Sequence, residues 1–325
     1  MRPAMKLKRS VCAVLALLLI VLLAGCGQKT QPAENGTDEK GKLSIVCSLF
    51  PLYDFARVIA GDRANVSLIL PYGVDSHDYE PSVGDAFAVS RADLFVYTDD
   101  ELETWVKNLS GSLENVKTLR CAANIDLEAL QEEWEAIENP HEEAEEHHHH
   151  KYDAHIWLDL SLAARMCESI KDALTTLDKE GAQIYGDNCA NLVKQLSDLD
   201  GRFDELFKAH PGAVLCFGGQ FAYSHFIRHY GVKYLSAYDS CSEEDEPSLG
   251  QVIRVIDGMK QSGLKAVFTD EHSNGDVARQ IAAETGAKVL VFHTLENISK
   301  AEAGESFVSL MTGNYRAVSG ALSGD

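Results

Sequence analysis

The stretch Tyr185–Leu206, YGDNCANLVKQLSDLDGRFDEL, decides how the rest of the chain is interpreted. Its apolar residues recur at alternating intervals of four and three, which is the spacing of one face of an α-helix. At a rise of 1.5 Å per residue, a helix over Lys179–Lys208 would be ~45 Å long. We therefore predict a long, rigid backbone helix over residues 179–209. The apolar stripe consists of Tyr185, Cys189, Leu192, Leu196, Leu199, Phe203 and Leu206.

Short apolar runs alternate with amphipathic helical segments on both sides of this helix. Repeated alternation of strand and helix is typical of a parallel sheet in an α/β layer. We predict an α/β fold with two lobes, residues 43–178 and 210–325, each with a mainly parallel sheet flanked by helices and joined by the backbone helix. The expected strands are LSIVCSL, NVSLIL, DLFVYT and VKTLRC in the first lobe, and AVLCFGG, VKYLSAY, KAVFTD and AKVLVFH in the second. The expected helices lie around Tyr53–Ala60, Gly84–Arg91, Leu102–Leu109, Ala222–Tyr230, Leu249–Gln261 and Gly275–Thr285.

The first 25 residues have the charged start and apolar run of a secretory signal peptide. The apolar run of about 15 residues is shorter than the ~20 that a spanning helix needs. The sequence Leu23-Ala24-Gly25-Cys26 resembles the lipobox of bacterial lipoproteins, in which the cysteine is acylated. We expect lipidation at Cys26, a disordered tether over 26–42, and an extracytoplasmic protein anchored to the membrane by its lipid.

Acidic residues outnumber basic ones, 50 to 29, and the formal net charge of the chain is −21. This charge argues against a nucleic-acid partner, whose phosphates would be repelled, and is compatible with a cation.

Six cysteines remain beyond Cys12 in the leader and Cys26. An even number in an exported chain permits disulfides, and coarse strand placement suggests the pairs Cys47–Cys121 and Cys216–Cys241. No CxxC spacing is present, so a thiolate metal site is not expected.

The segment Asn139–Leu160, NPHEEAEEHHHHKYDAHIWLDL, contains six of the chain's 12 histidines. We expect residues 139–152 to form a mobile, acidic loop that binds metal weakly as an accessory site. We treat His155 separately, because it precedes the strand-like IWLDL. The accessory histidines are His141, His147, His148, His149 and His150.

Three histidines stand near the ends of predicted elements, where a ligand could bind. His77 follows the predicted strand NVSLIL, His293 ends the predicted strand AKVLVFH, and His155 lies beside IWLDL. Open α/β sheets bind ligands at the carboxyl ends of their strands, so side chains from both lobes could meet there. Asp153 and Asp159 flank His155 and could orient its ring. Asp159 could equally cap a helix that begins near Ser161.

The chain resembles the solute-binding lipoproteins of bacterial zinc and manganese ABC importers over essentially its whole length. The matching stretches are FPLYDFARVIAGD, GVDSHDYEPS, DAHIWLDL, FAYSHFIRHYG, EPS at 246–248 and IAAETGAKVLVFHTL. The resemblance implies two lobes joined by a long helix, with the metal in the cleft. It further implies that His77 and His155 are the two histidine ligands of the N-terminal lobe, and that His293 stands where the family commonly has an aspartate ligand.

The chain departs from the family at Gln220, where relatives usually have a histidine or glutamate ligand. A neutral amide oxygen suits zinc poorly. Glu271, Asp270, His225 or a water molecule could replace it, and we favour Glu271. The predicted metal ligands are therefore His77, His155, His293 and Glu271, with Gln220 or water as alternatives to Glu271. Three imidazoles and at most one carboxylate favour Zn²⁺ over Mn²⁺.

We predict a monomeric, non-enzymatic protein that captures Zn²⁺ between two lobes and delivers it to a membrane ABC permease. One alternative is a zinc-dependent hydrolase with an open metal position, although the chain has no HExxH or GxSxG motif and no Walker or dinucleotide-binding glycine pattern. Another is a metal-buffering surface adhesin, in which the histidine-rich loop is the main site.

Overall fold

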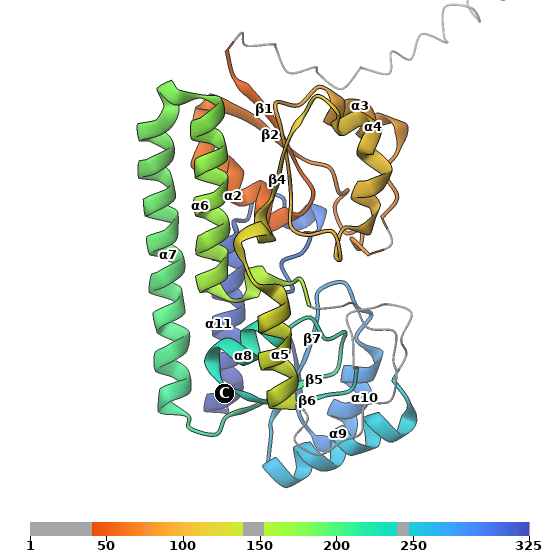
Figure 1. The fold of residues 1–325 in the computed structure, drawn as a ribbon. Coiled ribbons are helices and arrows are strands. Elements are labelled where there is room, and N and C mark those ends of the chain that lie inside the picture. The colour runs from red at the N-terminus through yellow and green to blue at the C-terminus, as the bar shows by residue number, and fades with distance from the viewer. Residues whose placement is uncertain (1–40, 78, 139–152, 239–246, 325) are drawn as a thin grey trace, which may run out of the picture. The chain divides into compact units, whose positions relative to one another are not determined.

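Two separate parallel sheets form the framework of the protein (Figure 1). The computed structural model describes residues 41–77, 79–138, 153–238 and 247–324. Residues Lys42–Asp325 form one compact unit. Both sheets have four strands, and every strand pair is parallel. The predicted α/β class with two mainly parallel sheets is confirmed.

The two sheets share one strand order, β2-β1-β3-β4 in the first and β6-β5-β7-β8 in the second. In each sheet the chain starts on an inner strand, adds a neighbour on one side and then crosses to the other side. Open α/β sheets bind ligands at such a crossing point, beyond the carboxyl ends of the strands. The strands are β1 (Leu43–Cys47), β2 (Ala64–Leu68), β3 (Leu94–Tyr97), β4 (Lys117–Arg120), β5 (Val214–Phe217), β6 (Lys233–Ser236), β7 (Ala266–Thr269) and β8 (Lys288–Val291).

The helices fill the connections between strands, as the alternating pattern predicts. The segment expected as a helix over Leu102–Leu109 differs, since Thr104–Leu109 is a 3₁₀ helix that leads into α4. Its start is fixed by the Glu103 carboxylate, which accepts hydrogen bonds from the backbone N–H groups of Thr98 and Asp99 after β3. The α-helices are α2 (Phe50–Ala60), α3 (Val83–Ser90), α4 (Ser110–Leu113), α5 (Leu127–Glu138), α6 (Leu160–Leu177), α7 (Ala182–Ala209), α8 (Ser224–Tyr230), α9 (Leu249–Ser262), α10 (Asp276–Thr285) and α11 (Phe307–Ser323).

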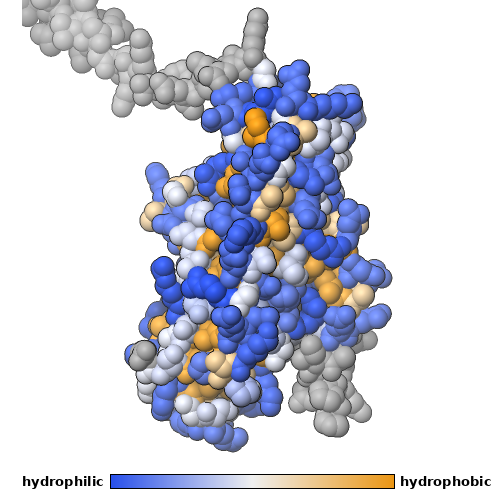
Figure 2. All heavy atoms as spheres, turned by 90° about the vertical axis from the view of Figure 1, so that its left-hand side faces the viewer, coloured by the Kyte–Doolittle hydropathy of each residue, from blue (hydrophilic) through white to orange (hydrophobic). Residues whose placement is uncertain are grey.

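Helix α7 is the long helix that the apolar stripe predicts, and it runs for 28 residues. All seven residues of the stripe are buried. The helix packs against α2 and α6 and also against α8 and α11, so it contacts elements from both halves of the chain. The side of the molecule that carries α7 is mostly hydrophilic, with small scattered hydrophobic areas (Figure 2). The one-sided stripe is thus explained by one buried and one solvated face.

The segment IWLDL is not a strand. Ile156–Leu158 forms a 3₁₀ turn, and Asp159 caps α6 by accepting hydrogen bonds from the backbone N–H groups of Ser161 and Leu162. The side chains of Ile156, Trp157 and Leu158 are all fully buried. A short apolar run of this kind looks the same in sequence whether it is a buried strand or a buried turn.

The predicted disulfide between Cys47 and Cys121 is wrong, because both are free, buried thiols. Cys216 is likewise free, and its predicted partner Cys241 lies outside the described residues. Burial raises the pKa of Cys216 to about 12. A buried thiol of this kind packs as a small apolar side chain.

Several predictions fall on residues that the structure does not describe. These are the leader, the tether up to residue 40, the lipid site Cys26, and the loop 139–152 with its five histidines. Among the described residues, no helix is both long enough and apolar enough to span a membrane.

Gly218 follows β5 and closely approaches α10. A Cβ atom there would lie 2.8 Å from Ala278 Cα, a backbone atom that cannot move freely. We expect Gly218→Ala to lower the free energy of unfolding by about 1–3 kcal/mol, as overpacking does. Gly201→Ala is the control, because its Cβ would meet open space in the middle of α7. That change should raise stability by about 0.5–1 kcal/mol. Urea denaturation of both variants checks this, and equal stabilities would contradict the close approach.

Candidate metal centre

Two histidines and a glutamate, from three separate segments of the chain, converge at one place. His77 lies after β2, Glu296 after β8, and His155 just before α6. One ligand atom from each lies within 4.8 Å of the others, and this is the sole such group of three among the described residues. The His155 Nε2 and Glu296 Oε2 atoms are 3.4 Å apart. Ligand atoms around a tetrahedral zinc ion are about 3.3 Å apart, given bonds of 2.0–2.1 Å.

The His155 ring is held in one orientation. The Asp153 Oδ1 atom is 2.7 Å from Nδ1 of the ring and also accepts a hydrogen bond from the backbone N–H of His155. Donation from Nδ1 leaves the lone pair of a neutral ring on Nε2, the nitrogen that faces Glu296. Asp153 therefore has the orienting role that its position in the sequence suggests, whereas Asp159 serves as the cap of α6. The edge of Trp157 packs against the same ring, with the centroids 5.2 Å apart.

Glu296 is a buried carboxylate in contact with both histidine segments. Its Oε1 atom accepts a hydrogen bond of 3.0 Å from the backbone N–H of Ser76, next to His77. Burial alone would favour the neutral acid, but the hydrogen bond with His155 and the proximity of His77 outweigh it and lower the pKa of Glu296. A buried anion that faces an imidazole nitrogen requires a proton or a metal cation between them.

The backbone just before Glu296 has an uncommon conformation. Leu295 has a φ of 63°, the sole positive φ at a non-glycine position among the described residues, and its side chain is fully buried. Such strain costs about 1–3 kcal/mol and is retained where the surrounding structure fixes it, often at a binding site. The left-handed turn at Leu295 separates Glu296 from His293.

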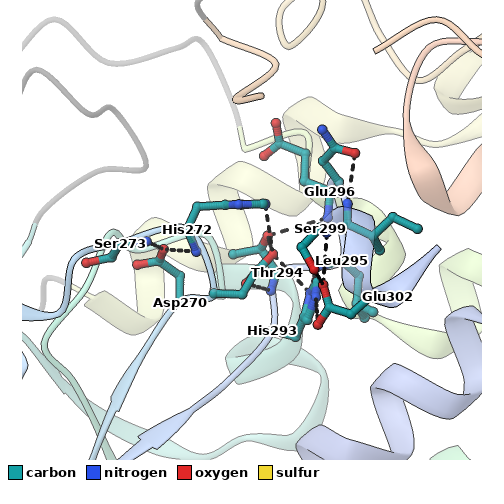
Figure 3. Close-up of polar contacts among 12 residues, drawn as sticks. Asp270, His272, Ser273, His293, Thr294, Leu295, Glu296, Ser299 and Glu302 are labelled. Atoms are coloured by element: carbon teal, nitrogen blue, oxygen red, sulfur yellow. Dashed lines mark hydrogen bonds and ion pairs between the residues drawn. The ribbon is translucent and has the colours of Figure 1, made fainter. Parts of the chain in front are cut away.

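His293 belongs to a neighbouring polar cluster with Thr294 and Glu302 (Figure 3), and Glu271 contacts His293 there. The His293 Nδ1 atom is 2.9 Å from Glu271 Oε1, and Nε2 is 3.6 Å from Glu302 Oε1. The other Glu271 oxygen accepts a hydrogen bond from the backbone N–H of Thr294. Burial would raise the pKa of Glu271, but the contact with His293 outweighs it and lowers this pKa. The structure thus pairs these two predicted ligands with each other.

The other predicted replacements for the fourth ligand have different surroundings. Gln220 is half-buried in the segment after β5. Asp270 is buried and accepts hydrogen bonds from the backbone N–H groups of His272 and Ser273. His225 is buried, and its Nε2 donates to the Asp153 carbonyl oxygen.

Glu296 is the residue that the sequence reasoning missed. His293 is the last residue of the predicted strand, and Glu296 stands only three positions later in HTLEN. Its nearness to the carboxyl end of β8 was the available signal, because ligands gather in the loops beyond such strand ends.

The two parallel sheets, the long helix and the group of two histidines and a glutamate define an α/β protein with a candidate site for a transition metal. The family model described as zinc-uptake complex component A, periplasmic (ZnuA), matches residues 45–321. The chain belongs to this family.

Two curated relatives cover most of the chain. The high-affinity zinc uptake system protein ZnuA of Bacillus subtilis is 30% identical over 308 residues, which are 93% of this chain and 94% of the relative. The zinc-binding lipoprotein AdcA of Streptococcus pneumoniae (strain R6) is 29% identical over 313 residues, which are 95% of this chain. The match spans 60% of the length of AdcA, so this chain corresponds to a part of that protein.

Two solved structures share the fold. The Zn(II)-bound ZnuA-like domain of Streptococcus pneumoniae AdcA superposes with a TM-score of 0.71 at 26% identity, covering 87% of this chain and 99% of the domain. The laminin-binding protein Lmb of Streptococcus agalactiae, described as a bifunctional protein with adhesin and metal-transporting activity, gives a TM-score of 0.72 at 26% identity, with 86% and 99% covered. The expected likeness to zinc-binding proteins of ABC uptake systems is confirmed.

Proposed function

We propose that the protein captures Zn²⁺ outside the cytoplasm and delivers it to a membrane ABC permease, with His77, His155 and Glu296 as its protein ligands. The observation that carries this proposal is the convergence of three ligand atoms within 4.8 Å. Two imidazoles and one carboxylate suit zinc, whereas manganese prefers a set richer in oxygen. The zinc-binding relatives support the same choice of metal.

For the fourth position we propose a water molecule or the Gln220 side chain. The alternative is the predicted set in which His293 and Glu271 join His77 and His155. In the described geometry His293 and Glu271 contact each other instead, so the alternative requires both side chains to turn toward the ion. An ion held by three protein ligands and a water molecule would also be exchanged more readily, as delivery to a permease requires.

We further propose how the parts of the chain serve this function. Residues 43–178 and 210–325 act as the two lobes, 179–209 links them, and the lipid on Cys26 with the tether 26–42 keeps the monomeric protein near its permease. Tethering raises the effective concentration at the partner without any new contact. We propose that the histidines of 139–152 bind additional metal ions with low affinity.

A carrier is favoured over the zinc hydrolase for two reasons. The family model is described as a zinc-uptake component, and the relative ZnuA of Bacillus subtilis is described as a high-affinity zinc uptake system protein. The carboxylate that faces the histidines, Glu296, is proposed as a ligand, which removes it as a general base for an attacking water. The adhesin alternative has a counterpart in Lmb, but no feature of the described residues favours it.

Competition with a chromophoric zinc chelator tests this function. The wild-type chain should bind one equivalent of Zn²⁺ tightly, and His77→Ala or His155→Ala should each weaken that binding by orders of magnitude. His210→Ala is the matched control, because His210 lies at the end of α7 with its Nδ1 near the Leu206 carbonyl oxygen. His148→Ala should leave the tight equivalent unchanged. Retained affinity in both His77 and His155 variants would refute the site, and hydrolysis of an ester or peptide with bound zinc would favour the enzyme.

A further inference from the structure

Helix α8 lies against the loop Asp153–Asp159, which carries His155, although about 70 residues separate the two in sequence. At the start of the loop, the Ser224 hydroxyl donates a hydrogen bond to Asp153 Oδ2. The next residue, His225, donates from Nε2 to the Asp153 carbonyl oxygen at 2.8 Å. Ser224 and His225 are both at least 95% buried. Two adjacent residues of α8 therefore hold both the side chain and the backbone of Asp153.

The far end of the same loop contacts α8 one turn later. The Arg228 guanidinium donates to Asp159 Oδ2 at 3.0 Å, and His229 Nδ1 lies 3.1 Å from the same oxygen. One face of α8 thus fastens the loop before and after His155. Ser224 also lies four residues after Gln220, so one segment carries a candidate metal ligand and also contacts the loop that carries His155.

The two carboxylate oxygens of Asp153 accept from different residues, His155 and Ser224. Oδ1 takes the backbone N–H and the Nδ1 atom of His155, and Oδ2 takes the Ser224 hydroxyl. Without the Ser224 contact the carboxylate could rotate about χ2, and the ring would lose the acceptor that keeps its proton on Nδ1. An imidazole that presents Nε2–H instead of a lone pair cannot bind a metal through that atom.

We propose that Ser224 and His225 are positioning residues that set the zinc affinity of His155 through Asp153. This inference rests on the proposed function, because it concerns the same ion. It extends the site to α8, which contributes no atom to the His77–His155–Glu296 group. Residues that orient a metal-bound histidine typically affect affinity by 10–100-fold.

Zinc affinity of the full chain tests the inference in Ser224→Ala and His225→Phe. Both should bind Zn²⁺ about 10–100-fold more weakly than the wild type, and Ser224→Thr, which keeps the hydroxyl, should restore most of the loss. Tyr230→Phe is the control on the same helix, since its hydroxyl contacts Asp200 of α7 and not the loop. Its affinity should match that of the wild type.

The tautomer of His155 provides a readout that a loss of packing would not change. In ¹⁵N-labelled, metal-free protein, long-range ¹H–¹⁵N spectra should show a proton on His155 Nδ1, where Asp153 accepts it, in addition to the proton that Nε2 shares with Glu296. The signal is assigned from its absence in His155→Ala. Ser224→Ala and Asp153→Asn should lower the occupancy of the Nδ1 proton, so that His155 shifts toward the form protonated at Nε2 alone. If Ser224→Ala does not fold, Asp153→Asn provides the same test of the His155 tautomer.

The outcomes separate this inference from the function on which it rests. If the wild type binds no Zn²⁺, the proposed function fails. If His155→Ala loses binding while Ser224→Ala, His225→Phe and Asp153→Asn all remain within threefold of the wild type, the function stands and the role of α8 is overturned. An unchanged His155 tautomer in Asp153→Asn would overturn it as well.

Discussion

Glu296→Gln is expected to weaken Zn²⁺ binding by at least about 100-fold, which corresponds to about 2.7 kcal/mol. The substitution keeps the shape of the side chain but removes the negative charge that faces His155 Nε2 at 3.4 Å. It also replaces a carboxylate, which zinc prefers, with a neutral amide. The hydrogen bond from the Ser76 N–H can persist to the amide oxygen, so the protein should remain folded. Competitive titration with a zinc chelator measures the change.

Glu271→Gln is the matched control, because it makes the same chemical change in the neighbouring cluster. Its carboxylate contacts His293 and Thr294, so we expect a loss of no more than about tenfold, the lower end of the range for residues that act on a metal site indirectly. The alternative ligand set makes the opposite prediction. If Glu271→Gln and His293→Ala lose binding by orders of magnitude while Glu296→Gln does not, then His293 and Glu271 are the ligands and Glu296 is not.

The framework of the molecule could be predicted because its signals are local in sequence. The 4-3 apolar spacing along α7 reports directly on one buried helix face, and all seven positions are buried in the structure. The inner strands β1 and β3 are short apolar runs because helices or other segments cover both faces of a parallel sheet. Where the local signal is ambiguous, as in the fully buried run Ile156–Leu158, the prediction of a strand was wrong.

The candidate site was only partly predictable, because its geometry depends on backbone conformation and distant packing. His77 and His155 follow from their positions near the ends of the expected elements. Glu296 depends on the left-handed turn at Leu295, a conformation that a leucine side chain disfavours and no pattern predicts. The contact of α8 with Asp153 joins residues 71 positions apart. No periodicity in either segment could reveal that contact.

A second charged cluster links the loop after His155 to α7 and α8. His229 of α8 lies between two carboxylates, with Nδ1 3.1 Å from Asp159 Oδ2 and Nε2 2.9 Å from Asp200 Oδ1. Arg228 also contacts Asp159, and the Tyr230 hydroxyl donates to Asp200. Burial opposes a charge on His229, but the hydrogen bonds to the two carboxylates outweigh it and raise the pKa of His229 to about 9. His229 is therefore an imidazolium at neutral pH, and it neutralises part of the negative charge gathered there.

His229→Gln is expected to lower the free energy of unfolding by about 2–3 kcal/mol near pH 6, and by progressively less as the pH rises toward 9. An ordinary histidine in the unfolded chain has a pKa near 6.5, so between pH 6.5 and about 9 the folded protein binds the extra proton. The contribution of His229 to the free energy of unfolding is thus fully present below pH 6.5 and is lost as the pH rises through about 9. Urea denaturation of both proteins from pH 6 to 9.5, with a chelator present so that metal binding does not contribute, measures the difference. Other titrating groups, such as Glu103, whose pKa burial raises to about 7, are common to both proteins and cancel in that difference. A difference that stays constant over this pH range would show that His229 contributes packing alone.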